Sequence, residues 1–280
     1  KRRMISATKG LSVWRGGENF DDLGGLDNIK AFMRRILKGR RAPRAIIFVD
    51  EIEKALAGSS GPVSDSSGVS QDQLQCLLTH MQDRGSAGMI FLGPPGSGKS
   101  ALAKAAGNEG DVPTVVMDLG AMKGSLVGDS EQTLRAALKV VDAIGGEGTL
   151  WAATCNSISS LPPELRRRFS LGVFWFDLPS PEERQVIWQI YKAKFEVDGL
   201  IPGDDGWTGA EIRQCCDIAS RLGCDLQEAA MYVVPVSVSA RDIISTLRTQ
   251  ALGRYISASY PGLYREPEKR VDTSKRRIVV

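Results

Sequence analysis

One glycine-rich segment constrains the fold of this 280-residue chain more than any other feature of the sequence. Residues 93–100 read Gly-Pro-Pro-Gly-Ser-Gly-Lys-Ser, which fits the pattern GxxxxGK[ST] between a short apolar run at 89–92 and a helical segment. Glycines let the backbone wrap closely around a phosphate, and the helix that follows directs its positive end to the same point. We therefore expect a phosphate-binding loop rather than a glycine turn with a surface lysine. Its predicted nucleotide contacts are Pro95, Gly96, Ser97, Gly98, Lys99, Ser100 and Ala101.

Two acids complete the predicted chemistry of this loop. We expect Lys99 to reach the β- and γ-phosphates and Ser100 to hold Mg²⁺. A second apolar run at 46–49 ends in Asp50 and Glu51. A carboxylate at a strand end can hold the water shell of Mg²⁺, which suits Asp50, and a second can orient the attacking water, which suits Glu51. Solvated acids at a strand end are the alternative, and the neighbouring phosphate-binding loop favours the catalytic interpretation.

Apolar runs alternate with helical segments over the first 180 residues. The runs predict an α/β fold with a five-stranded parallel sheet, its strands at 46–49, 89–92, 114–117, 149–154 and 173–176. From Ser180-Pro181 onward, apolar positions recur at helical spacing and no strand pattern is convincing. We therefore expect a nucleotide-binding α/β domain over 1–180, a small all-helical lid over 181–262 and a basic tail over 263–280.

Composition excludes several classes of protein. The single histidine, His80, excludes mechanisms that need two histidines, and the common zinc sites rich in histidine. Five cysteines without a CxxC pair suit a reducing compartment, so we expect a cytoplasmic protein. No apolar run approaches the length of a membrane span, so we expect no membrane partner. A net charge of +3 is too small to indicate nucleic-acid binding by itself.

Three further short segments, together with the two motifs above, resemble those of a known protein family. Residues 20–25 read Phe-Asp-Asp-Leu-Gly-Gly, 154–156 read Thr-Cys-Asn, and 207–210 read Trp-Thr-Gly-Ala. With the two motifs above, they resemble AAA+ ATPases of the AAA type over about residues 18–262. The Asp-Glu-Ile-Glu-Lys pattern and the segment at 124–131 resemble the stand-alone AAA proteins of cyanobacteria, plastids and phages.

The resemblance implies roles for individual residues. Leu23 and Gly24 would touch the adenine of ATP, Asn156 would help to position the attacking water, and Ala210 would stand at the sensor 2 position. Arg213 lies one turn further on and could reach phosphate, but an ordinary surface arginine is the favoured interpretation.

Residues 161–169 resemble the arginine-finger segment of the family, in which an arginine of one subunit reaches the nucleotide of the next. The usual insert between two arginines is missing here, which leaves the assignment open. Arg168 keeps its place before Phe169 and is the favoured finger, while Arg166 or Arg167 could share the role. A solvated basic turn is the alternative. A finger supplied in trans implies a homo-oligomer, most often a hexamer in this family.

Two features depart from the family. The pore segment normally offers an aromatic residue, whereas here Leu126, Val127 and Gly128 occupy it and are expected to face a central channel. In the family the phosphate-binding loop precedes the acidic strand, whereas here Asp50 precedes Lys99. With the family's sheet, the expected spatial order is 173–176, 89–92, 149–154, 46–49, 114–117, and Asp50 should still lie near Ser100.

The resemblance implies ATP hydrolysis that drives the remodelling of a macromolecule, with protein favoured over nucleic acid as the substrate. A nucleic-acid motor or loader is one alternative, and a scaffold that binds ATP to assemble and turns over slowly is another. Basic residues that could track nucleic acid, or form a solvated face, are Arg34, Arg35, Lys38, Arg40, Arg41 and Arg44.

Overall fold

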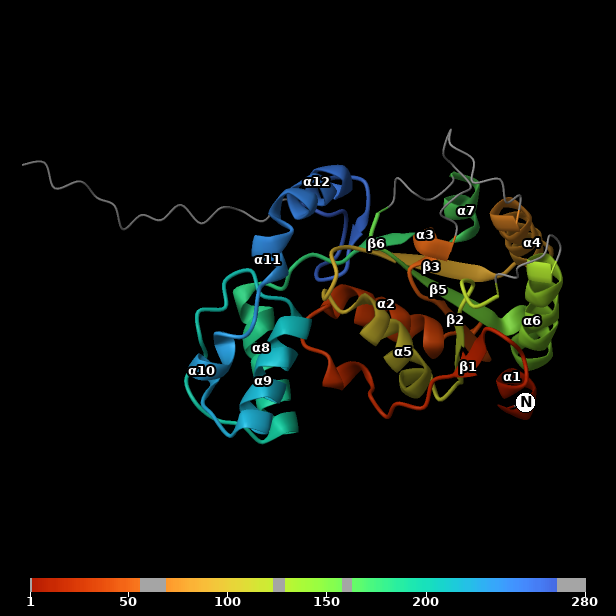
Figure 1. Cartoon of the computed structure of the whole chain (residues 1–280). Coiled ribbons are helices and arrows are strands. Elements are labelled where there is room, and N and C mark those ends of the chain that lie inside the picture. The colour runs from red at the N-terminus through yellow and green to blue at the C-terminus, as the bar shows by residue number, and fades with distance from the viewer. Residues whose placement is uncertain (1, 56–68, 123–128, 158–162, 266–280) are drawn as a thin grey trace, which may run out of the picture.

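A computed structural model describes residues 2–55, 69–122, 129–157 and 163–265 of the chain. Its centre is one mixed sheet (Figure 1). The strand order of this sheet is β1-β4-β2-β5-β3-β6-β7. Only β1 runs antiparallel to its neighbour, β4, and the other pairs of the sheet are parallel. The strands are β1 (Leu11–Val13), β2 (Ala45–Val49), β3 (Ala87–Leu92), β4 (Thr114–Met117), β5 (Thr149–Cys155), β6 (Val173–Trp175) and β7 (Ile256–Ser257).

The expected order of the five predicted strands is confirmed, because β4-β2-β5-β3-β6 forms the middle of the sheet. The expected count of five was wrong, since the described residues form a sheet of seven strands. The two additions are edge strands of three and two residues. Strands this short carry no apolar run, and β7 follows a stretch of helices. Their pairing depends on distant partners, such as Met117 opposite Leu11, which local sequence does not reveal.

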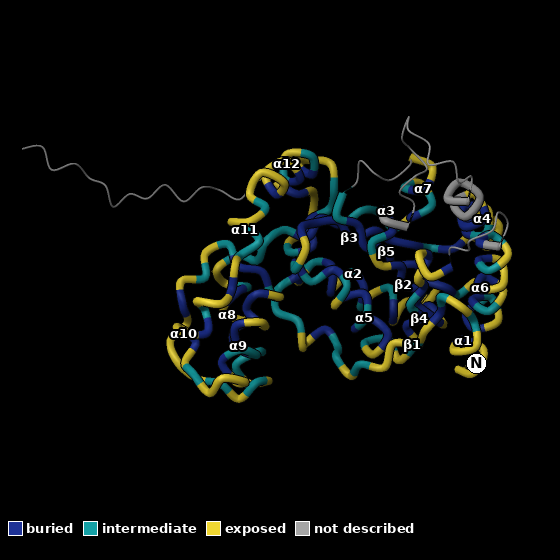
Figure 2. The backbone as a smooth tube through the Cα atoms, viewed as in Figure 1, coloured by how far each residue is buried: buried dark blue, intermediate teal, exposed yellow. Residues whose placement is uncertain are grey.

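Helices cover both faces of the sheet because successive strand residues point to opposite sides. Ile46 and Phe48 of β2 pack with α2 and α5, whereas Ile47 and Val49 pack with α4, α6 and α7. Figure 2 shows the resulting buried strands between exposed helix surfaces. The elements of this region are α1 (Arg2–Ser6), η1 (Phe20–Asp22), α2 (Asp27–Leu37), α3 (Ile52–Ala55), α4 (Val69–Asp83), α5 (Lys99–Gly110), α6 (Asp129–Gly145), η2 (Gly146–Gly148) and α7 (Pro163–Arg168). Within the described ranges, no helix is long and apolar enough to cross a membrane.

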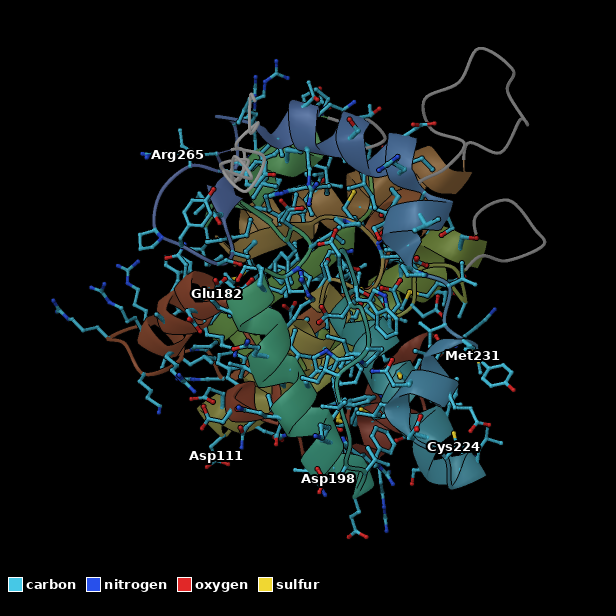
Figure 3. All side chains as sticks on the ribbon, turned by 90° about the vertical axis from the view of Figure 1, so that its left-hand side faces the viewer. Asp111, Glu182, Asp198, Cys224, Met231 and Arg265 are labelled. Carbon is cyan, nitrogen blue, oxygen red and sulfur yellow. The ribbon has the colours of Figure 1, made fainter. Side chains whose placement is uncertain are left out.

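Three helices beyond the sheet enclose a hydrophobic cluster of their own: α8 (Pro181–Phe195), α9 (Gly209–Leu222) and α10 (Leu226–Ala230). Trp188 and Trp207 meet at its centre, with ring centroids 6.0 Å apart. In Figure 3 this side faces the viewer, with Glu182 and Asp198 near the two ends of α8 and with Cys224 and Met231 just after α9 and α10.

The last helices return to the sheet. After α11 (Val236–Ser239), α12 (Arg241–Ala251) inserts Leu247 and Ala251 into the same core cluster as α4 and α6. Figure 1 shows α12 above the sheet, apart from α8 and α9. The range 181–262 therefore does not share one core, although the sequence predicts a single helical unit there. The limits of the domains stay a prediction.

The starts of α8 and α9 follow the expected capping chemistry. Ser180 Oγ accepts the backbone N–H of Glu183, and Glu183 Oε2 accepts that of Ser180. Thr208 and Glu211 repeat this reciprocal pair at α9. Both boxes satisfy N–H groups that a helix start leaves without partners, and they fix two helix N-termini beside the pocket described next.

Candidate functional site

A pocket of about 580 Å³ lies at the carboxyl ends of β2, β3 and β5, the edge where open α/β sheets bind ligands. Its lining comes from the chain after β3, from the acids after β2, and from α8 and α9. Every residue that the sequence predicts to contact nucleotide lines it, namely Leu23, Gly24, Pro95, Gly96, Ser97, Gly98, Lys99, Ser100, Ala101 and Ala210. Asp50, Glu51 and Asn156 line it as well.

The glycine-rich loop packs directly against the start of α9. Gly96 has φ of +80°, and a Cβ on it would lie 2.7 Å from Thr208 Oγ1. Both the backbone conformation and the space therefore require glycine at this position. The loop ends at Gly98, after which α5 begins with Lys99 and directs its N–H groups into the pocket.

Lys99 is a buried cation within this loop, with 6% of its surface exposed. Its Nζ donates to the carbonyl oxygens of Gly93 and Pro94, each at 2.7 Å. Burial lowers the pKa of Lys99 to about 8, while nearby carboxylates, first among them Glu53, act in the opposite direction. A charged ammonium in so dry a place is stabilised by an anion, and a phosphate group has the required charge and shape.

Asp50 and Ser100 meet at the end of the pocket next to β5. Ser100 Oγ donates to Asp50 Oδ1 at 2.8 Å, so the predicted proximity of these two residues is confirmed. Thr154 Oγ1 donates to the same carboxylate oxygen at 2.5 Å and accepts the backbone N–H of Glu51 at 2.8 Å. The hydroxyl of Thr154 thus ties both acids to the neighbouring strand.

Glu51 and Asn156 form the second polar pair. Asn156 Nδ2 donates to Glu51 Oε1 at 3.2 Å. Glu51 has φ of +46°, a left-handed conformation that L-residues with side chains rarely adopt. Such strain persists where the surrounding structure enforces it, and it is frequent at functional sites. Here the Thr154 hydroxyl holds the Glu51 N–H in place.

The oxygen atoms of this corner fit Mg²⁺. A carboxylate and a hydroxyl are hard ligands of the kind that magnesium prefers, and Mg²⁺ usually binds one or two protein groups together with phosphates and water. Across the described ranges, no group of three or more His, Cys, Asp and Glu side chains is placed to hold a metal ion alone. Asp50 and Ser100 would supply two of the oxygen ligands of Mg²⁺, together with phosphate and water.

The opposite half of the pocket is more apolar. Leu23, Gly24, Ile187 and Tyr191 line it, and a Cβ on Gly24 would lie 2.9 Å from the backbone nitrogen of Ile187. This close approach needs glycine, and it brings the segment before α2 against α8. An apolar lining of this kind suits a flat heterocyclic base. Polar side chains of α9 form its rim, namely Arg213, Gln214 and Asp217.

The predicted arginine fingers do not line the pocket of their own chain. Arg168 Nη2 instead donates to Gln82 Oε1 on α4 at 2.6 Å. Arg166 Nε and Arg168 Nε are buried and have no hydrogen-bond partner among the described residues. A trans role requires this separation but is not established by it. The pore residues Leu126, Val127 and Gly128 lie outside the described residues.

Sequence reasoning missed two contributions to the site and gave a third, Arg213, only as the less favoured interpretation. Thr154 was noted only as part of a strand end, and no local pattern predicts that its hydroxyl links two acids. Glu183 Oε1 accepts the backbone N–H of Leu26 at 3.2 Å, an interaction between segments far apart in the chain. Arg213 is exposed, as the favoured interpretation requires, yet it also lines the pocket rim.

The chain is similar to known AAA proteins. Residues 89–145 match the "ATPase family associated with various cellular activities (AAA)". The AAA domain-containing protein ycf46 of Gracilaria tenuistipitata var. liui is 30% identical over 262 residues, covering 76% of this chain and 46% of that protein. The proteasome-activating nucleotidase of Sulfurisphaera tokodaii is 27% identical over 187 residues, covering 48% and 47%. The chain thus spans about half the length of the curated relatives it matches.

A solved structure extends the likeness to most of the chain. The FIGL-1 AAA domain in complex with ADP has a TM-score of 0.53 and 18% identity, covering 89% of this chain and 95% of that domain. At this identity the likeness concerns the fold alone. The chain therefore has the fold of an AAA domain, and the segment from β3 to the end of α6 matches the sequence of that family.

Proposed function

We propose that the chain binds ATP and hydrolyses it with water as the nucleophile. The observation that carries the proposal is the convergence of Lys99, the Asp50–Ser100 pair and the Glu51–Asn156 pair at one end of a single pocket. The family match over residues 89–145 supports it, because that family consists of ATPases by its description.

Each group then has a task that its surroundings suit. The glycine-rich loop and the start of α5 hold the phosphates through backbone N–H groups, and Lys99 exchanges its two carbonyl partners for phosphate oxygens. Asp50 and Ser100 hold Mg²⁺, which when bound supplies positive charge beside the phosphates. Glu51 orients the attacking water and accepts its proton, and Asn156 keeps the Glu51 carboxylate aimed. Catalysis is thus mainly positioning and charge stabilisation.

Assembly and substrate form the second part of the proposal. We infer that Arg168, with Arg166 as the other candidate, completes the site of a neighbouring subunit in a homo-oligomer, for which a hexamer is the favoured form. ATP turnover then drives the remodelling of a macromolecule. The similarity to a proteasome-activating nucleotidase favours a protein substrate over nucleic acid. A cytoplasmic location stays a prediction.

Paired variants test the chemistry. Glu51→Gln should bind ATP with unchanged affinity yet hydrolyse it about 10² to 10⁴ times more slowly, the range for a lost general base. Lys99→Ala, in contrast, should bind ATP more weakly. Glu147→Gln makes the same change of charge at an exposed residue of η2 and should match the wild type. Binding is measured with a fluorescent ATP analogue and turnover by phosphate release.

The outcomes separate the alternatives. Normal turnover in Glu51→Gln would contradict the assigned chemistry. Tight, nucleotide-dependent assembly of the wild type with negligible phosphate release would favour the scaffold alternative. DNA binding with a steep dependence on salt concentration would favour a nucleic-acid motor or loader.

A further inference from the structure

Glu53 is a buried acid beside the site, and the mechanism above does not use it. It lies in the short helix α3, directly after the chain segment that carries Asp50 and Glu51. Its side chain turns inward, and the residue is 8% exposed. Glu53 Oε1 accepts the backbone N–H of Asn156 at 2.9 Å.

The surroundings of Glu53 make its burial costly. Its Oε2 atom is buried and accepts no hydrogen bond from an N–H or O–H group of the described residues. Burial and then the adjacent negative charge of Glu53 raise the pKa of the Cys155 thiol. A buried carboxylate with one oxygen unpaired destabilises a fold unless something compensates. The Asn156 N–H, the Cys155 thiol and the nearby charge of Lys99 offset part of this cost.

Three of the side-chain hydrogen bonds between the end of β2 and the end of β5 involve Glu51 or Asn156. Thr154 Oγ1 accepts the Glu51 N–H, Asn156 Nδ2 donates to Glu51 Oε1, and Glu53 Oε1 accepts the Asn156 N–H. Asn156 is therefore held twice by the same short segment, through its backbone by Glu53 and through its side chain by Glu51. The hydrogen bond from the Asn156 N–H to Glu53 fixes the position of the Asn156 backbone. The position of the backbone in turn determines whether the Asn156 carboxamide reaches Glu51.

We propose, on the basis of the function proposed above, that Glu53 is a positioning residue that fixes Asn156 so that its carboxamide aims the Glu51 carboxylate at the attacking water. Glu53 does not line the pocket, so it is not placed to contact a nucleotide or water bound there. Its loss should thus leave ATP binding intact and lower the rate of the chemical step. A displacement of about 1 Å in such a group can slow a reaction by about 100-fold.

The test compares two substitutions of similar size. Glu53→Met fills the same space but has no acceptor oxygen, and we expect kcat to fall by about 10- to 100-fold. The KM for ATP and the affinity for a slowly hydrolysed ATP analogue should stay within about twofold of the wild type. Glu53→Gln keeps an oxygen for the Asn156 N–H and should restore kcat to within about threefold. Glu53→Ser, too short to reach Asn156, repeats the comparison where Glu53→Met does not fold, as judged by thermal melting.

A double-mutant cycle shows through which residue Glu53 acts. If it acts through Asn156, Glu53→Met should lower kcat no further in an Asn156→Ala background, since groups that work as a unit are not additive. Full additivity, an equal loss in Glu53→Gln, or a loss of ATP affinity would each overturn the proposal. A wild type that binds ATP without hydrolysing it would remove the proposed function and this inference with it. A hydrolysing wild type with an unaffected Glu53→Met variant removes this inference alone.

Discussion

Replacing Lys99 with methionine should abolish phosphate binding and, near neutral pH, remove an electrostatic cost from the ligand-free fold. Lys99 is buried, and its ammonium group lies in a loop that is shaped for phosphate. Without phosphate, two carbonyl oxygens are its hydrogen-bond acceptors. Methionine has a similar length and no charge. The variant therefore separates the cost of the buried charge from the loss of side-chain volume.

The magnitude follows from the depressed pKa. Burial lowers the pKa of Lys99 from 10.5 to about 8, and each unit corresponds to about 1.4 kcal/mol. The protonated lysine thus destabilises the fold by roughly 3 kcal/mol below about pH 8. Between about pH 8 and 10.5 the unfolded chain binds more protons than the folded one, so the stability of the wild type rises with pH relative to the variant. Above that range the cost is gone.

The assay is urea unfolding without nucleotide and with EDTA, at about pH 7 and about pH 10. Methionine also removes two hydrogen bonds, but that loss should be largely the same at both pH values. The free-energy difference between wild type and Lys99→Met should therefore shift by roughly 2 to 3 kcal/mol in favour of the wild type at the higher pH. Lys139→Met, at an exposed position of α6, controls for the general loss of a lysine. A difference that stays constant with pH would refute the reasoning.

Three further predictions concern assembly, the loop and the helical cluster. Arg168→Ala should bind ATP yet hydrolyse it poorly, and mixing it with Glu51→Gln subunits should restore some phosphate release, whereas a monomer of full activity would exclude a trans finger. Gly96→Ala should weaken ATP binding by at least about tenfold in titrations, because its Cβ would meet Thr208 and its φ is left-handed; unchanged affinity would contradict the tight packing. Glu211→Ala should lower the free energy of unfolding by about 2 to 4 kcal/mol, since its carboxylate accepts two backbone N–H groups. A loss below about 0.5 kcal/mol would show that those hydrogen bonds are unimportant.

The phosphate-binding half of the site could be predicted because its chemistry is local. Phosphate recognition needs glycines, a lysine and a hydroxyl at fixed spacing, so residues 93–100 carry the whole pattern. Asp50 and Glu51 follow the same logic, since an apolar run that ends in acids marks a strand end. Their meeting with Ser100 was predicted from the resemblance to AAA proteins, because the sheet order that brings them together is not written in either segment.

Contacts between distant segments could not be predicted in this way. The Thr154 hydroxyl of β5 forms hydrogen bonds with both Asp50 and Glu51 after β2, and the Glu53 carboxylate reaches the backbone of Asn156. The local sequence around each of these residues is typical of an ordinary strand end or helix start. The two edge strands were not predicted for a related reason. Strands of two or three residues are stabilised by pairing with neighbouring strands rather than by the strand propensity of their own residues.

The position of β2 in the sequence has a consequence for folding during synthesis on the ribosome. This wholly buried strand leaves the ribosome before its two sheet neighbours, which begin only at Thr114 and Thr149. Until β4 has been synthesised, Ile46 to Val49 remain an apolar segment with both edges unpaired, and one edge stays unpaired until β5 follows. Such segments pair readily with other chains, and pairings so distant in sequence form slowly. Productive folding of the nascent chain therefore depends on shielding this strand until most of the sheet has left the exit tunnel.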